Sequence, residues 1–370
     1  MMNRRFLYLL LDNISQEQNT FALHRINVSG FFYPVRPPPS RSRGTERTVV
    51  GSSVNNQATI EDTRLPRPVI TFQPPSSYFE FGKMQFMRFS STQSGKDQII
   101  GTDQRGNTLL YNMDSHTIRV MPILNQPKRM CISLTVGDSL YVMDKFPRTS
   151  DTKCFEALTH GHTSSDPFSK LDWHWHSLPS PPYLFETGYM LPNSYVRSYT
   201  VVGHSNIWIS AKDIGTYSFD TVSRMWSKIG DWVLPFYGHT EYIPEYNMWF
   251  GLSDASNNLL CTSDLSTASE FKPPKLRHAW DDDLKLPEDW VRGMAYVVHL
   301  GSGKFCVARF FQTLDEEPCE GGFICRECER FLVLTVVEVE RCGKACRGLR
   351  IITHRSKRYR LENKLLDLVL

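Results

Sequence analysis

The sequence lacks any long hydrophobic run. Its most apolar N-terminal stretch, Phe6 to Leu11, follows two arginines but ends after six residues at Asp12. Such a run is too short for a membrane-spanning helix, and no small-residue cleavage site follows it, which argues against a signal peptide. We therefore interpret it as a strand and expect no membrane among the partners.

A regular cysteine framework is also absent. The nine cysteines are an odd number and are scattered between Cys131 and Cys346. Small secreted domains space their cysteines regularly because disulfides hold them together. The pattern favours a reducing compartment, and we expect a cytoplasmic and/or nuclear protein.

Signatures of catalysis are missing as well. The chain has no Gly-x-Ser-x-Gly nucleophile elbow, no Gly-rich phosphate loop and no His-Glu-x-x-His metal motif. We therefore assign no catalytic residue and no cofactor. These absences favour a non-catalytic protein, but they leave open an enzyme that gathers dispersed residues in one place.

What the sequence does contain is a repeated order of short strands. The 22 Gly, 22 Pro and 12% aromatic residues suit many strands joined by tight turns. One complete four-stranded unit runs from Ser198 to Ile229, and a similar order begins again 43 residues later, counted from Tyr199 to Tyr242. This spacing is typical of the blades of a β-propeller.

A constant interval supports the repeat. Phe219 and Trp226 are seven residues apart, and so are Tyr111 and Ile118. Including weaker copies, we expect units over residues 6–34, 98–122, 132–179, 198–229, 240–271 and 294–353. The prediction is therefore an all-β fold, a kelch-like β-propeller of about six four-stranded blades, forming a single domain over residues 1–370.

The chain ends are expected to close this ring. We predict that the N- and C-terminal strands pair, with Phe6–Leu11 beside Leu349–Thr353. Two insertions depart from the repeat, a disordered surface insertion at residues 35–68 and a second one at about 147–170. Residues 361–370 are expected to be a C-terminal tail that could also be a docking helix.

Several motifs carry a family resemblance. The turn glycine Gly203, the pair Phe219-Asp220 and Trp226 resemble the kelch pattern with one glycine in place of two. The strings Ser133-Leu-Thr-Val-Gly-Asp-Ser-Leu-Tyr-Val and Asp231-Trp-Val-Leu-Pro-Phe are similar to those of a large uncharacterised plant family, expanded in grasses and catalogued as domain of unknown function 1668. The resemblance implies a kelch-like propeller and assigns no activity.

Two patterns resemble metal ligands. Cys325 and Cys328 precede Cys342-Gly-Lys-Ala-Cys346, but residues 331–340 between them read as one strand about 33 Å long, so the two pairs should lie at opposite hairpin ends. His174 and His176 share a face if they lie on a strand, where Trp173 and Trp175 would point inward. We assign no metal site and keep Cys325, Cys328, His174 and His176 as candidates.

The densest basic run lies near the C-terminus. Residues 341–370 hold nine Lys and Arg against two acidic residues. Cations on an exposed strand can bind nucleic acid, serve as a nuclear signal or prevent edge-to-edge aggregation. The candidate partner-binding residues are Arg355, Lys357, Arg358 and Arg360.

The function that we expect is a non-catalytic intracellular protein-interaction scaffold whose partner is another protein. One alternative is a propeller enzyme or a carbohydrate-binding protein with a polar site in the central channel. A second alternative is a nucleic-acid binder that uses the basic terminal segments.

Overall fold

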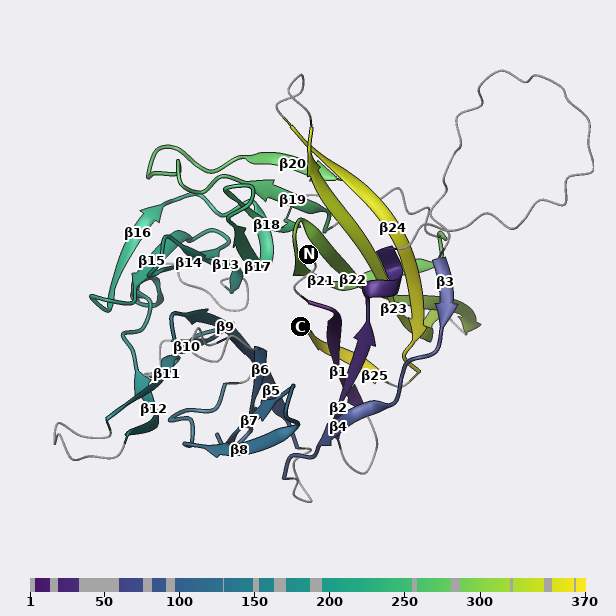
Figure 1. Ribbon diagram of the computed structural model, residues 1–370, viewed down its shortest axis with the longest axis horizontal. Helices are drawn as coiled ribbons and strands as arrows, with labels where there is room; N and C mark the ends of the chain where they lie inside the picture. Colours follow the sequence, from purple (N-terminus) through teal and green to yellow (C-terminus); the bar gives the residue numbers. More distant parts are fainter. Residues whose placement is uncertain are drawn as a thin grey trace, which may run out of the picture. The chain divides into compact units, whose positions relative to one another are not determined.

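Figure 1 shows the computed structural model of the chain. The structure describes residues 4–13, 19–32, 60–75, 82–90, 97–128, 130–148, 153–162, 171–186, 195–254, 258–280, 287–319, 322–342, 348–362 and 364–370. For residues 314–319 and 322–328 only the backbone is described. These residues form strands and two short 3-10 helices, so the expected all-β class is confirmed.

The chain forms two compact units. Unit 1 comprises residues 1–9, 23–69 and 281–369, and unit 2 comprises residues 10–22, 70–280 and 370. We describe each unit by itself. In the part of the chain that the structure describes, no helix is long and apolar enough to cross a membrane.

Unit 2 contains four consecutive antiparallel sets of four strands, each in the order of the sequence. The first set is β5 (Met84–Ser90), β6 (Asp97–Asp103), β7 (Thr108–Asn112) and β8 (Thr117–Met121), and the second is β9 (Cys131–Val136), β10 (Ser139–Asp144), β11 (Phe155–His162) and β12 (Leu171–Ser177). The third is β13 (Val196–Val202), β14 (Asn206–Ala211), β15 (Gly215–Asp220) and β16 (Met225–Gly230), and the fourth is β17 (Phe236–Ile243), β18 (Met248–Ser253), β19 (Leu260–Ser263) and β20 (Leu276–Trp280). Helix η2 (Pro182–Phe185) precedes the third set.

The first strands of the four sets are neighbours. β5 lies beside β9, β9 beside β13, and β13 beside β17. β13 and β17 pair in parallel, with Tyr199 opposite His239. Within unit 2, these inner strands lie on the inside of an arc and the fourth strand of each set lies outside (Figure 1). We call β5, β9, β13 and β17 the inner strands, and the sets are arranged like consecutive blades of a β-propeller.

Apolar side chains fill the space between successive sets. Phe89 of β5 and Leu140 of β10 belong to one buried cluster, and Phe155 of β11 and Ile209 of β14 belong to the next. Phe236 and Trp249 join the third and fourth sets in the same way through Trp208. The second and third sets are thus covered on both faces, and their inner and middle strands are apolar on both faces rather than on one.

The seven-residue interval of the sequence has a structural explanation. Phe219 of β15 is the direct partner of Trp226 on β16, and Tyr111 of β7 is the partner of Ile118 on β8. A fixed interval across a hairpin fixes which residues face each other, because side-chain direction alternates along a strand. The constant seven-residue interval therefore reflects the register in which the third and fourth strands of a set pair.

Two strands of unit 2 were missed in the sequence. β5 was assigned to no unit, and β11 lies inside the segment 147–170 that was expected to be an insertion. β11 pairs with β10 and β12 and therefore completes its sheet. The fourth strand of the last set was expected near Phe271 but lies at Leu276–Trp280, and Phe271 is largely exposed.

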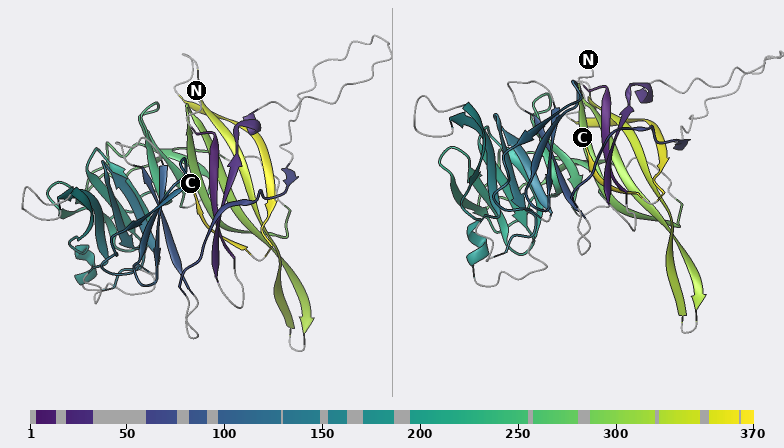
Figure 2. Two further views of the ribbon diagram at one scale, coloured as in Figure 1. Left: turned by 60° about the horizontal axis from the view of Figure 1, so that its bottom comes forward. Right: turned by 90° about the horizontal axis from the view of Figure 1, so that it is seen from below.

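Unit 1 is dominated by one long sheet. Its order is β21 (Trp290–Gly301), β22 (Lys304–Cys319), β23 (Gly322–Arg341), β24 (Leu349–Arg360) and β3 (Ile60–Thr63). β21 pairs with β22 only as far as Thr313, so the rest of β22 and the start of β23 form a two-stranded ribbon that Figure 2 shows projecting from the sheet. Helix η1 (Ser29–Phe32) contacts β24.

The ends of the chain meet in a further four-stranded sheet. Its order is β25 (Lys364–Val369), β1 (Phe6–Asn13), β2 (Thr20–Asn27) and β4 (Pro68–Phe72). N- and C-terminal strands are thus hydrogen-bonded neighbours, but the expected partner was wrong, since Leu349–Thr353 lies in β24 and pairs with β23. The expected tail at 361–370 is also wrong, because its apolar residues form β25 after a turn at Leu361.

The expected insertion at 35–68 falls largely outside the described residues, which resume at Ile60 with β3. β3 pairs in parallel with β24, and Glu61 lies opposite Lys357. The end of this segment is therefore part of the long sheet and was wrongly assigned to the insertion. The single domain over residues 1–370 stays a prediction.

Candidate functional site

The cysteine candidates lie on the projecting ribbon. Backbone pairing places Cys325 opposite Glu316, close to the turn that joins β22 and β23, whereas Cys342 follows the other end of β23. The intervening strand is continuous, as the sequence indicated. The side chains of Cys325 and Cys328 lie outside the described residues, so their role stays a prediction.

His174 and His176 lie together on one face of β12. Their ring centroids are 4.3 Å apart, and Trp173 and Trp175 pack on the opposite face. The Asp172 carbonyl oxygen, 3.3 Å from His174 Nδ1, can only accept a hydrogen bond, so Nδ1 carries the proton and Nε2 accepts from the Thr159 hydroxyl at 3.3 Å. Among the described residues no group of three possible metal ligands exists. Burial lowers the pKa of His176.

The basic candidates on β24 have partners within unit 1. Arg358 makes a bidentate ion pair with Asp62 of β3, with distances of 2.5 and 2.9 Å, and stacks over Trp290. Arg360 Nε lies 2.9 Å from Glu329 Oε1. Arg355 lies 3.9 Å from Glu61, and Lys357 lies over the ring of Phe31. The parallel pairing of β3 with β24 thus brings acidic residues to the basic strand, which is a structural use of these charges.

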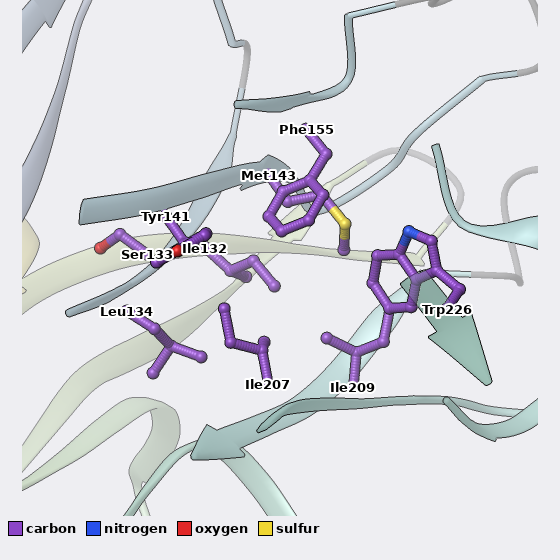
Figure 3. A pocket seen from close by; sticks show the side chains of 9 residues that line it. All are labelled: Ile132, Ser133, Leu134, Tyr141, Met143, Phe155, Ile207, Ile209 and Trp226. Atoms are coloured by element: carbon purple, nitrogen blue, oxygen red, sulfur yellow. The ribbon is translucent and has the colours of Figure 1, made fainter. Parts of the chain in front are cut away.

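Figure 3 shows an apolar gap between the second and third sets of unit 2. Phe155 and Met143 of the second set point into it from one side, and Ile207, Ile209 and Trp226 of the third set point into it from the other. The same side chains belong to the buried cluster between these sheets. We therefore assign the gap to core packing.

A different group of side chains lies where the inner strands begin. Lys145, Tyr195, Arg197, Tyr237 and Asp254 come together from four strands or their ends, and we call this group the inner-strand site. All five side chains are half-buried. Neighbouring antiparallel strands place the end of one beside the start of the other, which explains why residues so far apart in sequence meet here.

Backbone hydrogen bonds fix the position of Lys145. Its N–H donates to the Met130 carbonyl at 2.8 Å, and its carbonyl accepts from the Val196 N–H at 3.0 Å. Lys145 thus connects the start of β9 with the start of β13. Asp254 is fixed similarly, because its N–H donates to the Pro235 carbonyl before β17 at 3.3 Å.

β-bulges direct two further side chains of the site, Arg197 and Tyr237. Arg197 is the extra residue of a bulge in β13, between the pairs Val196 with Ala211 and Ser198 with Ser210. β17 has an irregular register between Tyr237 and Glu241, and Gly238 there has φ of 72°, a conformation that favours glycine. Bulges change the direction of a side chain and are common beside functional sites.

The charges of the site are unevenly paired. Arg197 makes an ion pair with Asp254. Lys145 Nζ instead lies over two tyrosine rings, 5.6 Å from the centroid of Tyr195 and 5.7 Å from that of Tyr237. Burial lowers the pKa of Lys145, because a desolvated ammonium group is less stable than a neutral amine. Burial likewise raises the pKa of Tyr237.

A ring pair continues the surface along the same two strands. Tyr199 and His239 have ring centroids 5.6 Å apart. His239 is solvent-exposed, yet desolvation by the surrounding protein lowers its pKa, and the charge of Arg88 on β5 lowers it further although Glu241 opposes the shift. No hydrogen bond joins His239 to an acid or a nucleophile within the described ranges, so the pair lacks the connection that acid–base catalysis uses.

The inner-strand site was not found from the sequence. Its residues belong to no motif, and they are separated by up to 109 positions, from Lys145 to Asp254. The only local signal is the alternation of Arg197, Tyr199 and Val201 on one face of a strand and Tyr237, His239 and Glu241 on the next.

The comparison with protein families gives one result. The chain belongs to the family described as "Protein of unknown function (DUF1668)", whose model matches residues 4–359. This confirms the resemblance found in the sequence, while the plant source stays a prediction. No curated protein matches the sequence.

Solved structures show only distant likeness. The β-propeller domain of Cps50 (Swd1) from Myceliophteria thermophila has a TM-score of 0.36 and 10% identity, over 78% of this chain and 87% of that one. An auxiliary nutrient binding protein from Bacteroides thetaiotaomicron has a TM-score of 0.35 and 11% identity, over 78% and 68%. The N-terminal domain of Nup159 has a TM-score of 0.29 and 9% identity, over 81% and 85%. Likenesses at these scores carry no argument about this chain.

Proposed function

We propose that this chain is a non-catalytic protein-interaction scaffold of the cytoplasm and/or nucleus. Its sheets would form about six blades of a closed, kelch-like β-propeller, with four blades from unit 2. The support for blades is the series of four-stranded sets with neighbouring first strands. In this proposal the sheets are rigid supports for a binding surface.

The observation that carries the proposal is the composition of the inner-strand site. Tyrosine and arginine are enriched at the energetically important positions of protein interfaces, because they combine a large apolar area with polar groups. Tyr195, Arg197 and Tyr237 are half-buried; Arg197 and Tyr237 lie on bulged strands, and Tyr195 directly precedes β13. Little order is then lost on binding, which favours affinity.

The test is proximity labelling with the full chain in native tissue, compared with a tag-only control. We expect a small set of enriched proteins, and we expect Tyr195→Ser with Tyr237→Ser to reduce their enrichment by about tenfold or more, since hot-spot residues contribute about 2 kcal/mol or more. Tyr242→Ser is the matched control, because Tyr242 lies on the same β17 but bonds to Asn247 outside the site. If no protein is enriched above the control, the proposal is wrong.

A further inference from the structure

We propose that the inner-strand site binds a single carboxylate group on an acidic segment of a partner protein, with Lys145 as the counter-ion. This inference rests on the proposed scaffold function and names the chemical class that the scaffold would recognise. It is carried by the pairing, charge and rigidity of five residues of unit 2.

The ammonium group of Lys145 lacks a counter-ion among the described residues. Its side chain is half-buried, and among the described residues its ammonium group has neither an ion-pair partner nor a hydrogen-bond acceptor. Lys228 provides an internal comparison. It lies 5.5 Å from the ring centroid of Tyr217 but also pairs with the Asp231 carboxylate at 2.8 Å. At this second position in the protein, a lysine that lies over a tyrosine ring also forms an ion pair with a carboxylate.

The side chains of the site carry a net positive charge. Lys145 and Arg197 are cations and Asp254 is an anion, so one positive charge is left. A carboxylate carries one negative charge, whereas a phosphate monoester carries nearly two and would be repelled more strongly by Asp254. The balance therefore favours a carboxylate.

The guanidinium group of Arg197 is incompletely hydrogen-bonded within the described residues. Arg197 Nε is buried and has no hydrogen-bond acceptor within the described ranges, although the terminal guanidinium nitrogen pairs with Asp254. Buried donors without acceptors are rare and destabilising, so a small shift of the guanidinium group that exposes Nε to a ligand oxygen would satisfy one. The phenol groups of Tyr195 and Tyr237 are also without hydrogen-bond partners in the part of the chain that is described.

The backbone supports the site in a fixed position. Backbone hydrogen bonds hold Lys145 between β9 and β13, and the bulge holds Arg197 on β13. The tyrosine rings are half-exposed and can contact the aliphatic part of a Glu side chain and its neighbours. An accessible surface of this kind suits a chain segment better than a small molecule, which is usually enclosed.

The experiment measures binding of a fluorescent peptide of alternating Glu and Gly to the full-length protein at low salt. We expect Lys145→Gln to weaken binding by about tenfold or more, as a hydrogen bond to a charged group contributes about 1.5–3 kcal/mol. Lys145→Arg should retain most of the affinity. Lys228→Gln is the matched control and should change the affinity by less than about twofold, because its carboxylate partner is already present.

Three further ligands test whether the bound group is a carboxylate on a peptide. The Gln and Gly counterpart should not bind, and equal binding of it would overturn the inference. A phosphoserine and Gly peptide that binds more tightly through Lys145, or free glutarate that binds as tightly as the Glu peptide, would also overturn it. The inference is equally wrong if Lys145→Gln binds the Glu peptide with unchanged affinity.

A second readout is the pKa of Lys145, which NMR measures on the protein with methyl-labelled lysines. The signal that disappears in the Lys145→Arg variant belongs to Lys145. Addition of the Glu peptide should raise this pKa, because a nearby carboxylate favours the charged amine, and no rise would contradict the inference. If proximity labelling finds partners that Lys145→Gln still binds normally, the inference is wrong and the scaffold function is retained. If no partner is found although the peptide binds, the scaffold function is wrong.

Discussion

Removal of one charge from the buried ion pair of Lys128 and Glu156 should strongly destabilise the protein. The two side chains are 1% and 0% exposed, and Lys128 Nζ lies 2.6 Å from Glu156 Oε1. The ammonium group also donates to the Gln126 and Lys153 carbonyls at 2.8 and 2.7 Å. Glu156 accepts from Asn125 Nδ2 at 2.6 Å and from the Gln126 N–H at 3.1 Å. The pair thus connects the loop before β9 to β11.

Glu156→Gln keeps the shape of the side chain and removes its charge. The amide oxygen can still accept hydrogen bonds, but the buried ammonium group of Lys128 then lacks its counter-ion. Breaking a buried pair by removing one partner costs about 3–5 kcal/mol, whereas replacing both partners can be nearly neutral. We therefore expect about 3–5 kcal/mol for Glu156→Gln and a smaller loss for the double variant Lys128→Met with Glu156→Gln.

The assay is urea unfolding followed by tryptophan fluorescence, with the slope compared between variants to verify that the same surface unfolds. Asp231→Asn is the control, because Asp231 is 93% exposed in its pair with Lys228 and exposed pairs contribute about 0–1 kcal/mol. A loss below about 1 kcal/mol for Glu156→Gln would refute the reasoning. So would a double variant whose loss equals the sum of the two single losses, since it would mean that the charges do not interact.

Two predictions concern titration and thiol reactivity. Desolvation by the surrounding protein is the largest cause that lowers the pKa of four histidines in the folded protein. As the pH falls below about 6.5, the unfolded chain therefore binds protons at these histidines before the folded chain does. The free energy of unfolding should decrease over this pH range. These histidines are His24, His176, His239 and His278. Urea midpoints between pH 7.5 and 5.5 test this, and a midpoint that rises on acidification would contradict it. Burial raises the pKa of Cys261 and Cys306 to about 12, so iodoacetamide at pH 8 should modify these thiols only after the protein unfolds. Peptide mass spectrometry measures the modification, and modification of either thiol in the native protein would refute the prediction.

Strand order in unit 2 was largely predictable from the sequence because hairpin register is local. The interval from Phe219 to Trp226 reports a direct cross-strand pair, and the same interval located β7 and β8. The sequence does not predict β11, because the segments on both sides of it fall outside the repeat. Only its pairing with β10 and β12 identifies it as a strand. The sequence also does not predict the last strand, β25, because a short apolar segment shows no periodicity that identifies it as a strand before it pairs.

The sequence by itself determined the all-β class, the four-stranded repeat and the family, since alternation and turn residues act over a few positions. Tertiary structure alone decided which charges meet. It paired Arg358 with Asp62 through a parallel strand, and it left Lys145 between two tyrosine rings. These contacts join residues that are far apart in sequence, and their energies depend on distance and burial, which no local pattern records.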